Sequence, residues 1–303
     1  MAWINEANWP EAWSEIGFSP MMRSGSDYIV YAGGYNIAKF YKYNLTTQTW
    51  TELAVPPGAI YGAISMSPDG TKLAAHIVNG SQLFIYTIAT NSWATSAVAP
   101  VLSTGGAAQI WTTVWADNDT IWSHVRDAVT SGKNKCYKYV VSTNTWTQYT
   151  NVYTLGPYTV SSCMSVNSAG TALYFGGVFS GADRSLGVKY VIATDTYSQI
   201  TIGSGWDYNQ NSDRSAKLWH IDATTAYAGT RYYNCDTEAV SGIIFPNDSL
   251  RDKISQYLAC GIYATGYIIA WHKTTEPKNR SYLGILPTTP TSGVSYALGR
   301  RNV

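Results

Sequence analysis

The sequence has few charged side chains, and its positive and negative charges almost cancel. Only 13% of its 303 residues are Asp, Glu, Lys or Arg, against about 25% in an average soluble protein. The formal net charge is +1 and the isoelectric point is about 7.6. Since no strong field of either sign is present, we expect neither a nucleic-acid partner nor attraction to an anionic membrane.

Long apolar runs are also missing. No uninterrupted apolar stretch approaches the roughly 20 residues that a membrane-spanning helix requires, so we expect no membrane insertion. The first residues, MAWINEANWPEAWSEIG, show neither a basic start nor an apolar core, so no signal peptide is predicted.

Cysteine is scarce, and its spacing excludes some chemistry. The four cysteines, Cys136, Cys163, Cys235 and Cys260, form no C-x-x-C pair, which argues against a zinc site or thioredoxin-type chemistry. An even number permits disulfides, but a chain of this size does not need them. The sequence also lacks a nucleophile-elbow motif, a phosphate-binding loop and a dinucleotide fingerprint. We therefore predict no catalytic residue, no metal and no cofactor.

Aromatic and small polar residues are abundant instead. The chain has 24 Tyr, 12 Trp and 26 Gly, together with many Thr, Ser and Asn. Aromatic and β-branched residues favour strands, while Gly, Asn and Ser favour turns. With 45% hydrophobic residues there is enough apolar side chain for a large core. This composition predicts an all-β fold.

An aromatic-rich strand followed by a polar turn and another aromatic recurs along the chain. The four copies read FYKYNLTTQTWTEL, LFIYTIATNSWATS, CYKYVVSTNTWTQY and VKYVIATDTYSQI. They place Trp50, Trp93, Trp146 and Tyr197 at equivalent positions, at intervals of 43, 53 and 51 residues. Strict alternation before each turn predicts half-buried strands, and repetition at a fixed period indicates a repeat architecture.

Two further apolar segments precede each copy, so each unit is predicted to hold four strands. Two looser units follow near the C-terminus, and six units in the chain average about 50 residues each, as repeat periods of this kind do. Because the fifth and sixth units are faint, five or seven units stay open. The predicted units are 18–56, 57–100, 104–152, 155–204, 213–250 and 254–290.

Several of these residues resemble the kelch repeat, in which a double glycine ends a hydrophobic strand and aromatic residues follow. The residues that carry this resemblance are Gly33, Gly34, Gly176, Gly177, Tyr41, Tyr43 and Trp50. The second unit, with SMSPDGTKL, looks more similar to the turn of WD40 repeats. The resemblance implies a single β-propeller domain over residues 1–303, in which each unit is one four-stranded blade.

The resemblance also suggests roles for the repeated residues. The glycines would permit close backbone approach and a positive φ where blades crowd together. The aromatic ring of each outer strand would lie between adjacent blades. We expect the N-terminus to close the ring, with residues 12–16, including Trp13, pairing with RSYLGIL in the last blade. The competing closure uses residues 294–299.

Four polar residues are candidates for ligand binding: His76, His124, His272 and Arg231. In the repeat alignment the three histidines fall at one position, near the end of the second strand, where other units carry Gly33 or Gly176. They could form a shared site on one face of the ring, or the position could simply tolerate a polar residue of medium size. A copper oxidase similar to galactose oxidase would need a Tyr–Cys pair beside two histidines, and the sequence shows no such group.

These features together predict a non-enzymatic structural or binding propeller that is displayed on a larger assembly. The expected setting is a virion surface, such as a phage capsid or tail, or another extracellular location, with other proteins as partners. Few charges and many Tyr and Trp residues suit a surface that contacts neighbours. The alternative is a carbohydrate-binding propeller at a cell surface that binds glycans. A kelch-type oxidase or glycan-active enzyme is the less favoured third reading.

Overall fold

The architecture comes from a computed structural model of the chain, and its strands follow the alternating segments of the sequence. The residues described are 4–6, 10, 16–19, 22–24, 27–34, 37–44, 46–77, 80–100, 108–127, 133–149, 153–154, 160–178, 186–201, 218–220, 225–228, 231–242, 259–262, 267–272 and 280–285. Over these ranges the regular structure consists of β-strands, without helices. Accordingly, no helix in the described part of the chain is able to span a membrane.

The strands form six antiparallel sheets, numbered here in chain order. Sheet 1 contains β2 (Ile16–Phe18), β4 (Asp27–Gly34), β5 (Phe40–Asn44) and β6 (Thr49–Glu52), with β3 (Met22–Ser24) also paired to β4. Sheet 2 contains β7 (Ile60–Met66), β8 (Lys72–Ile77), β9 (Leu83–Thr87) and β10 (Ser92–Thr95).

Sheets 3 and 4 have the same order of strands. Sheet 3 contains β11 (Ala108–Trp115), β12 (Thr120–Asp127), β13 (Lys133–Val140) and β14 (Thr145–Gln148), with β15 (Tyr153–Thr154) also paired to β13. Sheet 4 contains β16 (Val160–Val166), β17 (Ala172–Val178), β18 (Leu186–Val191) and β19 (Thr196–Thr201).

The last two sheets lie in the C-terminal part of the chain. Sheet 5 contains β20 (Leu218–His220), β21 (Thr225–Ala228), β22 (Arg231–Asn234) and β23 (Ala239–Gly242). Sheet 6 contains β24 (Ala259–Ile262), β25 (Tyr267–His272) and β26 (Arg280–Ile285), followed by β1 (Ile4–Glu6) from the N-terminal end.

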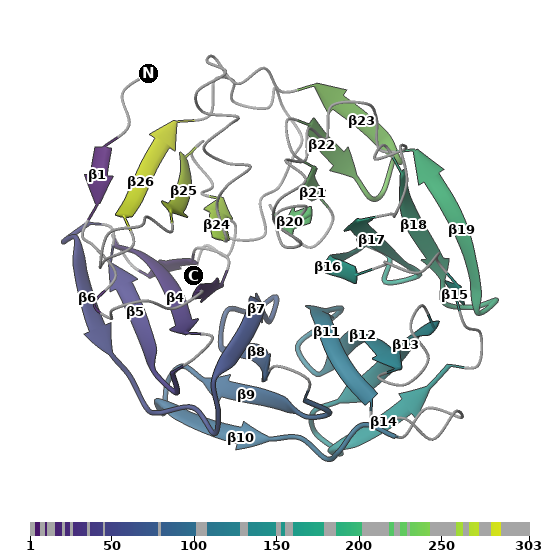
Figure 1. Cartoon of the computed structure of the whole chain (residues 1–303), viewed down its shortest axis with the longest axis horizontal. Coiled ribbons are helices and arrows are strands. Elements are labelled where there is room, and N and C mark those ends of the chain that lie inside the picture. The colour runs from purple at the N-terminus through teal and green to yellow at the C-terminus, as the bar shows by residue number, and fades with distance from the viewer. Residues whose placement is uncertain are drawn as a thin grey trace.

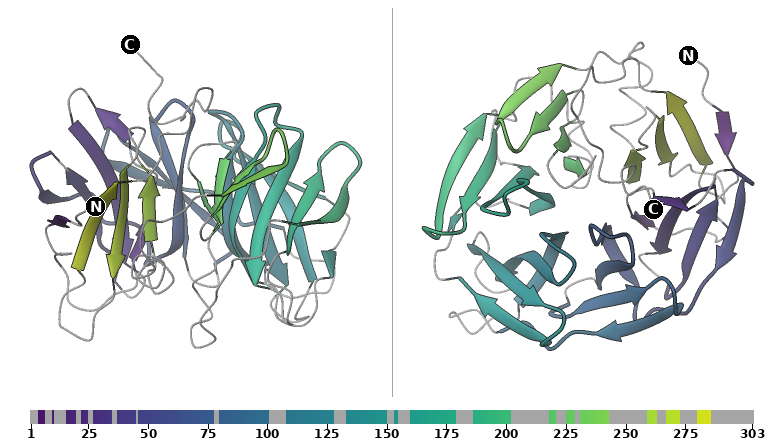
Figure 2. Two further views of the ribbon diagram at one scale, coloured as in Figure 1. Left: turned by 90° about the horizontal axis from the view of Figure 1, so that it is seen from above. Right: turned by 180° about the vertical axis from the view of Figure 1, so that it is seen from behind.

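The sheets are arranged in chain order around a common centre (Figure 1). The first strand of each sheet lies innermost, and these strands contact one another in the order β2, β7, β11, β16, β20 and β24, with β24 also contacting β2. In the side view the strands cross the thickness of the disc at a slant (Figure 2). The expected all-β, propeller-like architecture built from four-stranded antiparallel sheets is therefore confirmed over the described residues.

The core consists of apolar layers between consecutive sheets. Alternate residues of each strand point to opposite neighbours, because successive side chains leave a strand on opposite faces. In sheet 3, Ile121 and Tyr139 pack against sheet 2, whereas Trp122 and Cys136 pack against sheet 4. Sheets 1 and 2 enclose a third layer. Since both faces of sheet 2 are covered, its third strand β9 is buried at four consecutive positions, Leu83 to Tyr86.

The N-terminal strand pairs with the last sheet, but through different residues from those expected. Ile4 lies opposite Leu283 and Glu6 opposite Ser281, so β1 takes the outer position beside β26. The prediction that residues 12–16 fill this position was wrong. Ile16 belongs to β2, where it pairs with Gly34 as part of the inner strand of sheet 1. Trp13 and residues 294–299 lie outside the described residues.

The double glycine of the first repeat allows two sheets to approach closely. A Cβ built on Gly33 would lie 2.6 Å from Cδ1 and 2.9 Å from Cβ of Ile60 in β7, and real Cβ atoms do not approach so near because packed interiors leave no spare room. The predicted positive φ does not occur at Gly33 or Gly34, which continue the extended strand β4. Gly176 and Gly177 likewise lie within β17.

Candidate functional site: the turns and aromatic residues that join neighbouring sheets

One turn recurs between the third and outermost strands of five sheets, and we call these the outer turns. Each contains one non-glycine residue with a positive φ, two positions before the repeated aromatic position. These residues are Gln48 (φ 56°), Asn91 (φ 48°), Asn144 (φ 53°), Asp195 (φ 51°) and Glu238 (φ 55°). A turn followed by one left-handed residue is a common hairpin connection, and Asn and Asp adopt this conformation more readily than other side chains.

In sheets 2 and 3 the left-handed asparagine also reaches the preceding sheet. Asn91 Oδ1 accepts hydrogen bonds from the Ala54 backbone N–H at 2.9 Å and from the Tyr86 hydroxyl at 2.7 Å. Asn144 Oδ1 accepts the equivalent bonds from the Ala97 backbone N–H at 2.7 Å and from the Tyr139 hydroxyl at 2.8 Å. The same side-chain oxygen therefore fixes its own turn and holds the end of the neighbouring sheet.

The repeated tryptophan binds the same alanine from the other side. The indole N–H of Trp93 donates to the Ala54 carbonyl at 2.9 Å, and that of Trp146 donates to the Ala97 carbonyl at 2.8 Å. Both backbone polar groups of one partly exposed alanine are thus hydrogen-bonded to the next sheet. We call this pair of contacts, one from Asn and one from Trp, the inter-sheet lock.

The rings of these tryptophans also cover the edges of the apolar layers. Trp93 packs on the layer between sheets 1 and 2, with its centroid 4.8 Å from that of Phe40 and 4.9 Å from that of Tyr86. Trp146 packs on the layer between sheets 2 and 3, 4.8 Å from Tyr139. Each ring stays half-buried, so it closes the outer end of the layer rather than filling its middle.

Trp50 and Tyr197 occupy the same strand position with different contacts. The Trp50 ring lies 4.6 Å from Tyr43 in its own sheet. The Tyr197 ring lies tilted against that of Tyr190, with centroids 4.5 Å apart, and its hydroxyl accepts the Cys136 backbone N–H of sheet 3 at 3.1 Å. The fourth copy thus joins sheets 3 and 4 through a phenol instead of an indole.

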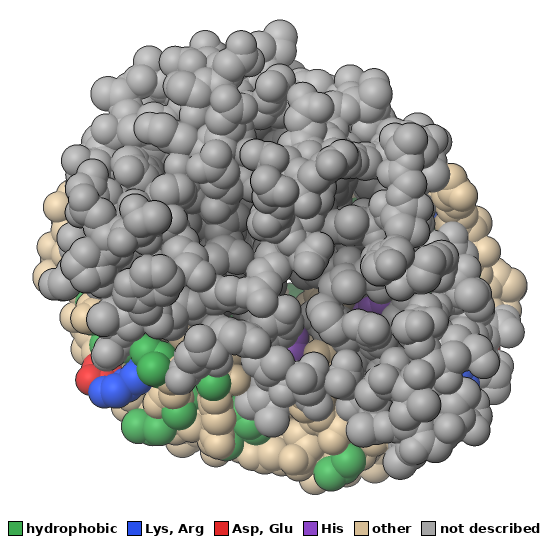
Figure 3. All heavy atoms as spheres, viewed as in Figure 1, with side chains coloured by type: hydrophobic (Ala, Val, Ile, Leu, Met, Phe, Trp, Pro, Cys, Tyr) green, Lys and Arg blue, Asp and Glu red, His purple; other side chains and the backbone are tan. Residues whose placement is uncertain are grey.

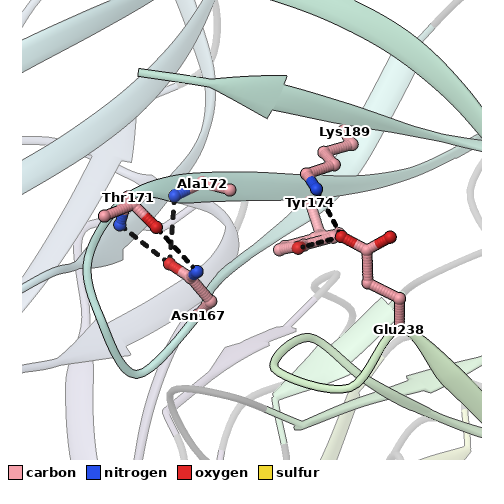
Figure 4. Close-up of polar contacts among 6 residues, drawn as sticks. All are labelled: Asn167, Thr171, Ala172, Tyr174, Lys189 and Glu238. Atoms are coloured by element: carbon pink, nitrogen blue, oxygen red, sulfur yellow. Dashed lines mark hydrogen bonds and ion pairs between the residues drawn. The ribbon is translucent and has the colours of Figure 1, made fainter. Parts of the chain in front are cut away.

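Sheets 4 and 5 are joined by charged groups (Figure 4). The Glu238 carboxylate, in the outer turn of sheet 5, accepts hydrogen bonds from the Tyr174 hydroxyl at 2.9 Å and from Lys189 Nζ, both in sheet 4. These two donors, the lysine ammonium first, hold the pKa of Glu238 below its usual value. Lys189 Nζ lies 5.9 Å from the centre of the Tyr174 ring. Because Glu238 is exposed, the ion pair is screened by solvent and contributes little to stability.

A second series of contacts joins the turns between the first and second strands to neighbouring sheets. Asn118 Oδ1 of sheet 3 accepts the Asp69 backbone N–H of sheet 2 at 2.9 Å. Asp236 Oδ1 of sheet 5 accepts the Ser168 backbone N–H of sheet 4 at 2.7 Å. Asn167 stabilises the latter turn internally, with its Oδ1 accepting the Thr171 and Ala172 N–H groups (Figure 4). These contacts join consecutive sheets without using the residues of the inter-sheet lock.

The outer turns of sheets 1–4 display the same exposed pair of hydroxyl groups. In each, two side-chain hydroxyls flank the left-handed residue and lie 2.7 Å apart. The pairs are Thr47–Thr49, Thr90–Ser92, Thr143–Thr145 and Thr194–Thr196. On the face shown in Figure 3, the coloured atoms near the rim are mainly uncharged. The outer turns of sheets 1–4 are therefore rich in exposed hydroxyl groups, although the described surface also exposes Val55, Val98 and the Lys39–Glu52 ion pair.

The structure places the candidate histidines in separate apolar layers. His76 in β8 alternates with Leu73 and Ala75, which pack toward sheet 1, so it faces sheet 3. His124 in β12 shares a face with Trp122, toward sheet 4. Both side chains are buried, and burial lowers the pKa of His124 to about 3, which keeps the imidazole neutral near pH 7. These two histidines therefore do not converge on one ligand.

The register of the second and third strands corrects part of the alignment. The residue pairs between these two strands can be counted from the first paired residue of the second strand. On this count the fifth pair of sheets 1 to 4 contains Gly33, His76, His124 and Gly176, respectively. In sheet 6 the fifth pair is Trp271 with Ser281, and His272 follows in the sixth, opposite Arg280. The prediction that His272 shares the position of the other histidines was wrong by one residue. Arg231 lies in β22, opposite Ala228 and Gly242.

One candidate histidine does lie beside a cysteine. His124 is paired across the strands with Cys136, whose backbone binds Tyr197. Burial raises the pKa of the Cys136 thiol well above its usual value, so the buried thiol is inert near neutral pH. Cys136 is a free thiol, and Cys235 is also buried. Among the described residues, no three His, Cys, Asp or Glu side chains are grouped to hold a metal ion.

Comparison with known proteins supplies no family: no protein-family model matches the sequence, and no curated protein matches it. What the chain does must therefore be inferred from its own residues and their geometry.

The left-handed residues of the outer turns were not recognised from the sequence, although a signal for them was present. Each of the first four turns reads Thr-x-Thr or Thr-x-Ser before the aromatic residue, where x is Gln, Asn or Asp. Asn and Asp favour the left-handed conformation and accept local hydrogen bonds. Their bonds to the preceding sheet could not be read from the sequence, because the partners lie 37 and 47 residues away.

Proposed function

We propose that the chain is a kelch-like β-propeller of six blades, closed by its N-terminal strand, that acts as a structural or binding component of a larger assembly. The six sheets, the repeated inter-sheet lock and the pairing of β1 with β26 support the architecture. Closing the sheets into a ring protects their apolar faces and leaves only short edges. The setting that we propose is a virion surface, such as a phage capsid or tail.

The observation that carries the functional proposal is the repetition of exposed, uncharged hydroxyl pairs at four successive outer turns. Hydroxyl groups can donate and accept hydrogen bonds, so such a rim can adapt to the polar rim of a protein interface without a demand for opposite charge. Sparse charge over the whole chain is compatible with a surface that is covered by neighbours. The proposed partners are therefore other proteins of the assembly.

Co-assembly tests this proposal directly. The chain is co-expressed with the products of its neighbouring genes, and sedimentation shows whether it travels with an assembled particle. We expect the wild type to do so and a variant with Thr47→Lys, Thr90→Lys, Thr143→Lys and Thr194→Lys to remain in the soluble fraction. Ala169→Lys, at an exposed position in a turn between first and second strands, is the control and should still assemble.

The result that would overturn the proposal is a wild-type monomer that joins no particle. If that monomer also binds sugars on a glycan array, the carbohydrate-binding reading takes its place. Circular dichroism of the four-lysine variant must first show an unchanged fold, since the substitutions remove four exposed hydrogen bonds. Each such bond contributes only about 0.5–1.5 kcal/mol, so folding should survive.

A further inference from the structure

Two polar atoms are buried between sheets 2 and 3 without a hydrogen-bond partner among the described residues. They are the indole Nε1 of Trp115, whose side chain is 1% exposed, and the hydroxyl Oγ of Ser123, which is fully buried. Each buried donor or acceptor that stays unpaired costs about 1–3 kcal/mol. Unpaired groups of this kind in native structures call for an explanation, and an ordered water molecule is a common one.

The strand register places both groups on the same face of sheet 3. Ser123 in β12 lies opposite Thr113 in β11, and Trp115 lies opposite Ile121, two residues along each strand. Side chains two residues apart on a strand leave from the same face. Trp115 and Ile121 belong to the apolar layer that faces sheet 2, so Ser123 points into that layer too. The two residues are therefore diagonal neighbours on the face of sheet 3 that meets sheet 2.

A polar contact already crosses the interface at this point. The Ser65 hydroxyl of sheet 2 and the Thr113 hydroxyl of sheet 3 lie 2.9 Å apart and share a hydrogen bond. Thr113 is the cross-strand partner of Ser123, so three hydroxyl groups and one indole N–H gather within this layer, which also holds the buried His76 side chain. These polar side chains together can form several hydrogen bonds to one small polar molecule.

We propose that one water molecule is bound in this interface, where it accepts a hydrogen bond from Trp115 Nε1 and bonds to Ser123 Oγ. The indole N–H is only a donor, so the bound species must accept, and the serine hydroxyl can serve in either sense. A neutral molecule suits the site, because an unpaired ion among apolar side chains carries a large desolvation cost. Buried waters commonly make about three hydrogen bonds, and the Ser65–Thr113 pair offers the third.

A high-resolution crystal structure tests the proposal. We expect a well-ordered density peak within about 2.7–3.2 Å of both Trp115 Nε1 and Ser123 Oγ, the range of ordinary hydrogen bonds. Three outcomes would overturn it. These are an empty interface, a Ser123 hydroxyl that donates to a backbone carbonyl instead, and a bromide peak at the site in crystals soaked in bromide, which would reveal an anion.

A substitution gives an independent test, because a bound water molecule and an unpaired Ser123 hydroxyl predict changes of stability in opposite directions. If a water molecule is bound, Ser123→Ala removes one of its partners, and the equilibrium constant for folding should fall about five-fold. If Ser123 Oγ is truly unpaired, the same change removes a buried polar atom, and the constant should rise. Ser168→Ala, at an exposed position in the turn between β16 and β17, gives the baseline for losing a hydroxyl and should change the constant little.

A double-mutant cycle then asks whether the two groups share one molecule. Trp115→Phe removes the indole N–H. If both groups bind the same water molecule, Ser123→Ala should reduce the stability less in the Trp115→Phe variant than in the wild type. Strict additivity would contradict a shared site. Because Trp115→Phe also alters packing, the direction of the stability change in Ser123→Ala alone remains the decisive result.

Discussion

At the scale of single residues, one non-glycine residue in the outer turn of each of five sheets has a left-handed backbone conformation, and its side chain sets the cost. Asn and Asp tolerate this conformation, while longer side chains are disfavoured there. Gln48 and Glu238 are therefore the least suited of the five residues. Glu238 is compensated by its bonds to Tyr174 and Lys189.

Gln48→Asn is expected to stabilise the protein. The substitution places a better left-handed residue at φ 56° and should raise the free energy of unfolding by about 0.5–1 kcal/mol. Urea denaturation measures the change. The reverse change in an equivalent turn, Asn91→Gln, is the control and should destabilise, because Asn91 also binds Ala54 and Tyr86. A loss of stability with Gln48→Asn would contradict the assignment of this turn.

Buried His124 should make the protein sensitive to mild acid. Its folded-state pKa of about 3 lies below the unfolded value of about 6.5, so the unfolded chain takes up a proton first as the pH falls. The stability that the neutral His124 side chain contributes is fully present above pH 6.5 and is lost as the pH falls from 6.5 to 3. At pH 5 the loss should be about 2 kcal/mol.

Urea denaturation at pH 7.5 and pH 5 measures this effect by difference. The variant His124→Gln cannot be protonated in this range, so its stability should fall less between the two values than that of the wild type. Carboxylates titrate alike in both proteins and cancel in the comparison. Equal losses in wild type and variant would show that His124 is not buried as a neutral imidazole.

At the scale of elements, the inter-sheet lock combines one long-range hydrogen bond with the covering of an apolar edge. Trp93→Phe removes the indole N–H and leaves the Ala54 carbonyl without that donor, so we expect a loss of about 1 kcal/mol. Trp93→Ala also uncovers the layer between sheets 1 and 2, and should cost about 2–4 kcal/mol because the ring is only half-buried.

Trp146→Phe should likewise cause the smaller loss of stability and Trp146→Ala the larger one, because Trp146 makes the same contacts between sheets 2 and 3. Thermal or chemical denaturation of all four variants provides the measurement. If the Phe and Ala variants lose equal stability at either position, the ring contributes nothing beyond its hydrogen bond, contrary to the structure.

Gly33→Ala should force sheets 1 and 2 apart. The added methyl group would meet Ile60 Cδ1 at 2.6 Å, and overpacking of this kind typically costs about 1–3 kcal/mol. Ile60→Val removes the nearest atom, so it should recover part of the loss in the double variant. Absence of any recovery would place the cause in the β4 backbone rather than in the contact with Ile60.

Individual sheets were the most predictable level of structure, because their signals are local. Alternation and the polar turn after it identified the strands around Trp93 and Trp146, which the structure places in β10 and β14. Register was harder to predict. The faint sixth unit gave His272 the position that the ladder assigns to Trp271, because YIIAWH in β25 lacks the alternation of polar and apolar residues that would specify its register.

At the scale of the whole molecule, closure depends on which N-terminal segment pairs with sheet 6. Two segments of the sequence look alike, AWINE and AWSEI, and either could supply a short outer strand. The structure pairs the first with β26 and uses Ile16 at the end of the second to begin the inner strand of sheet 1. Local pattern could not decide between them, because the partner strand lies at the opposite end of the chain.

The most direct measurement of this closure is a disulfide between Asn5→Cys and Tyr282→Cys, which lie opposite each other in β1 and β26. Paired residues of an antiparallel sheet have Cα atoms about 4.5–5.5 Å apart, within reach of a disulfide. Lys42→Cys with Thr51→Cys, opposite each other in sheet 1, is the positive control. Mass spectrometry of the oxidised, monomeric protein should find the 5–282 linkage as readily as the control linkage. Formation of the control linkage alone would contradict a ring closed by the N-terminal strand.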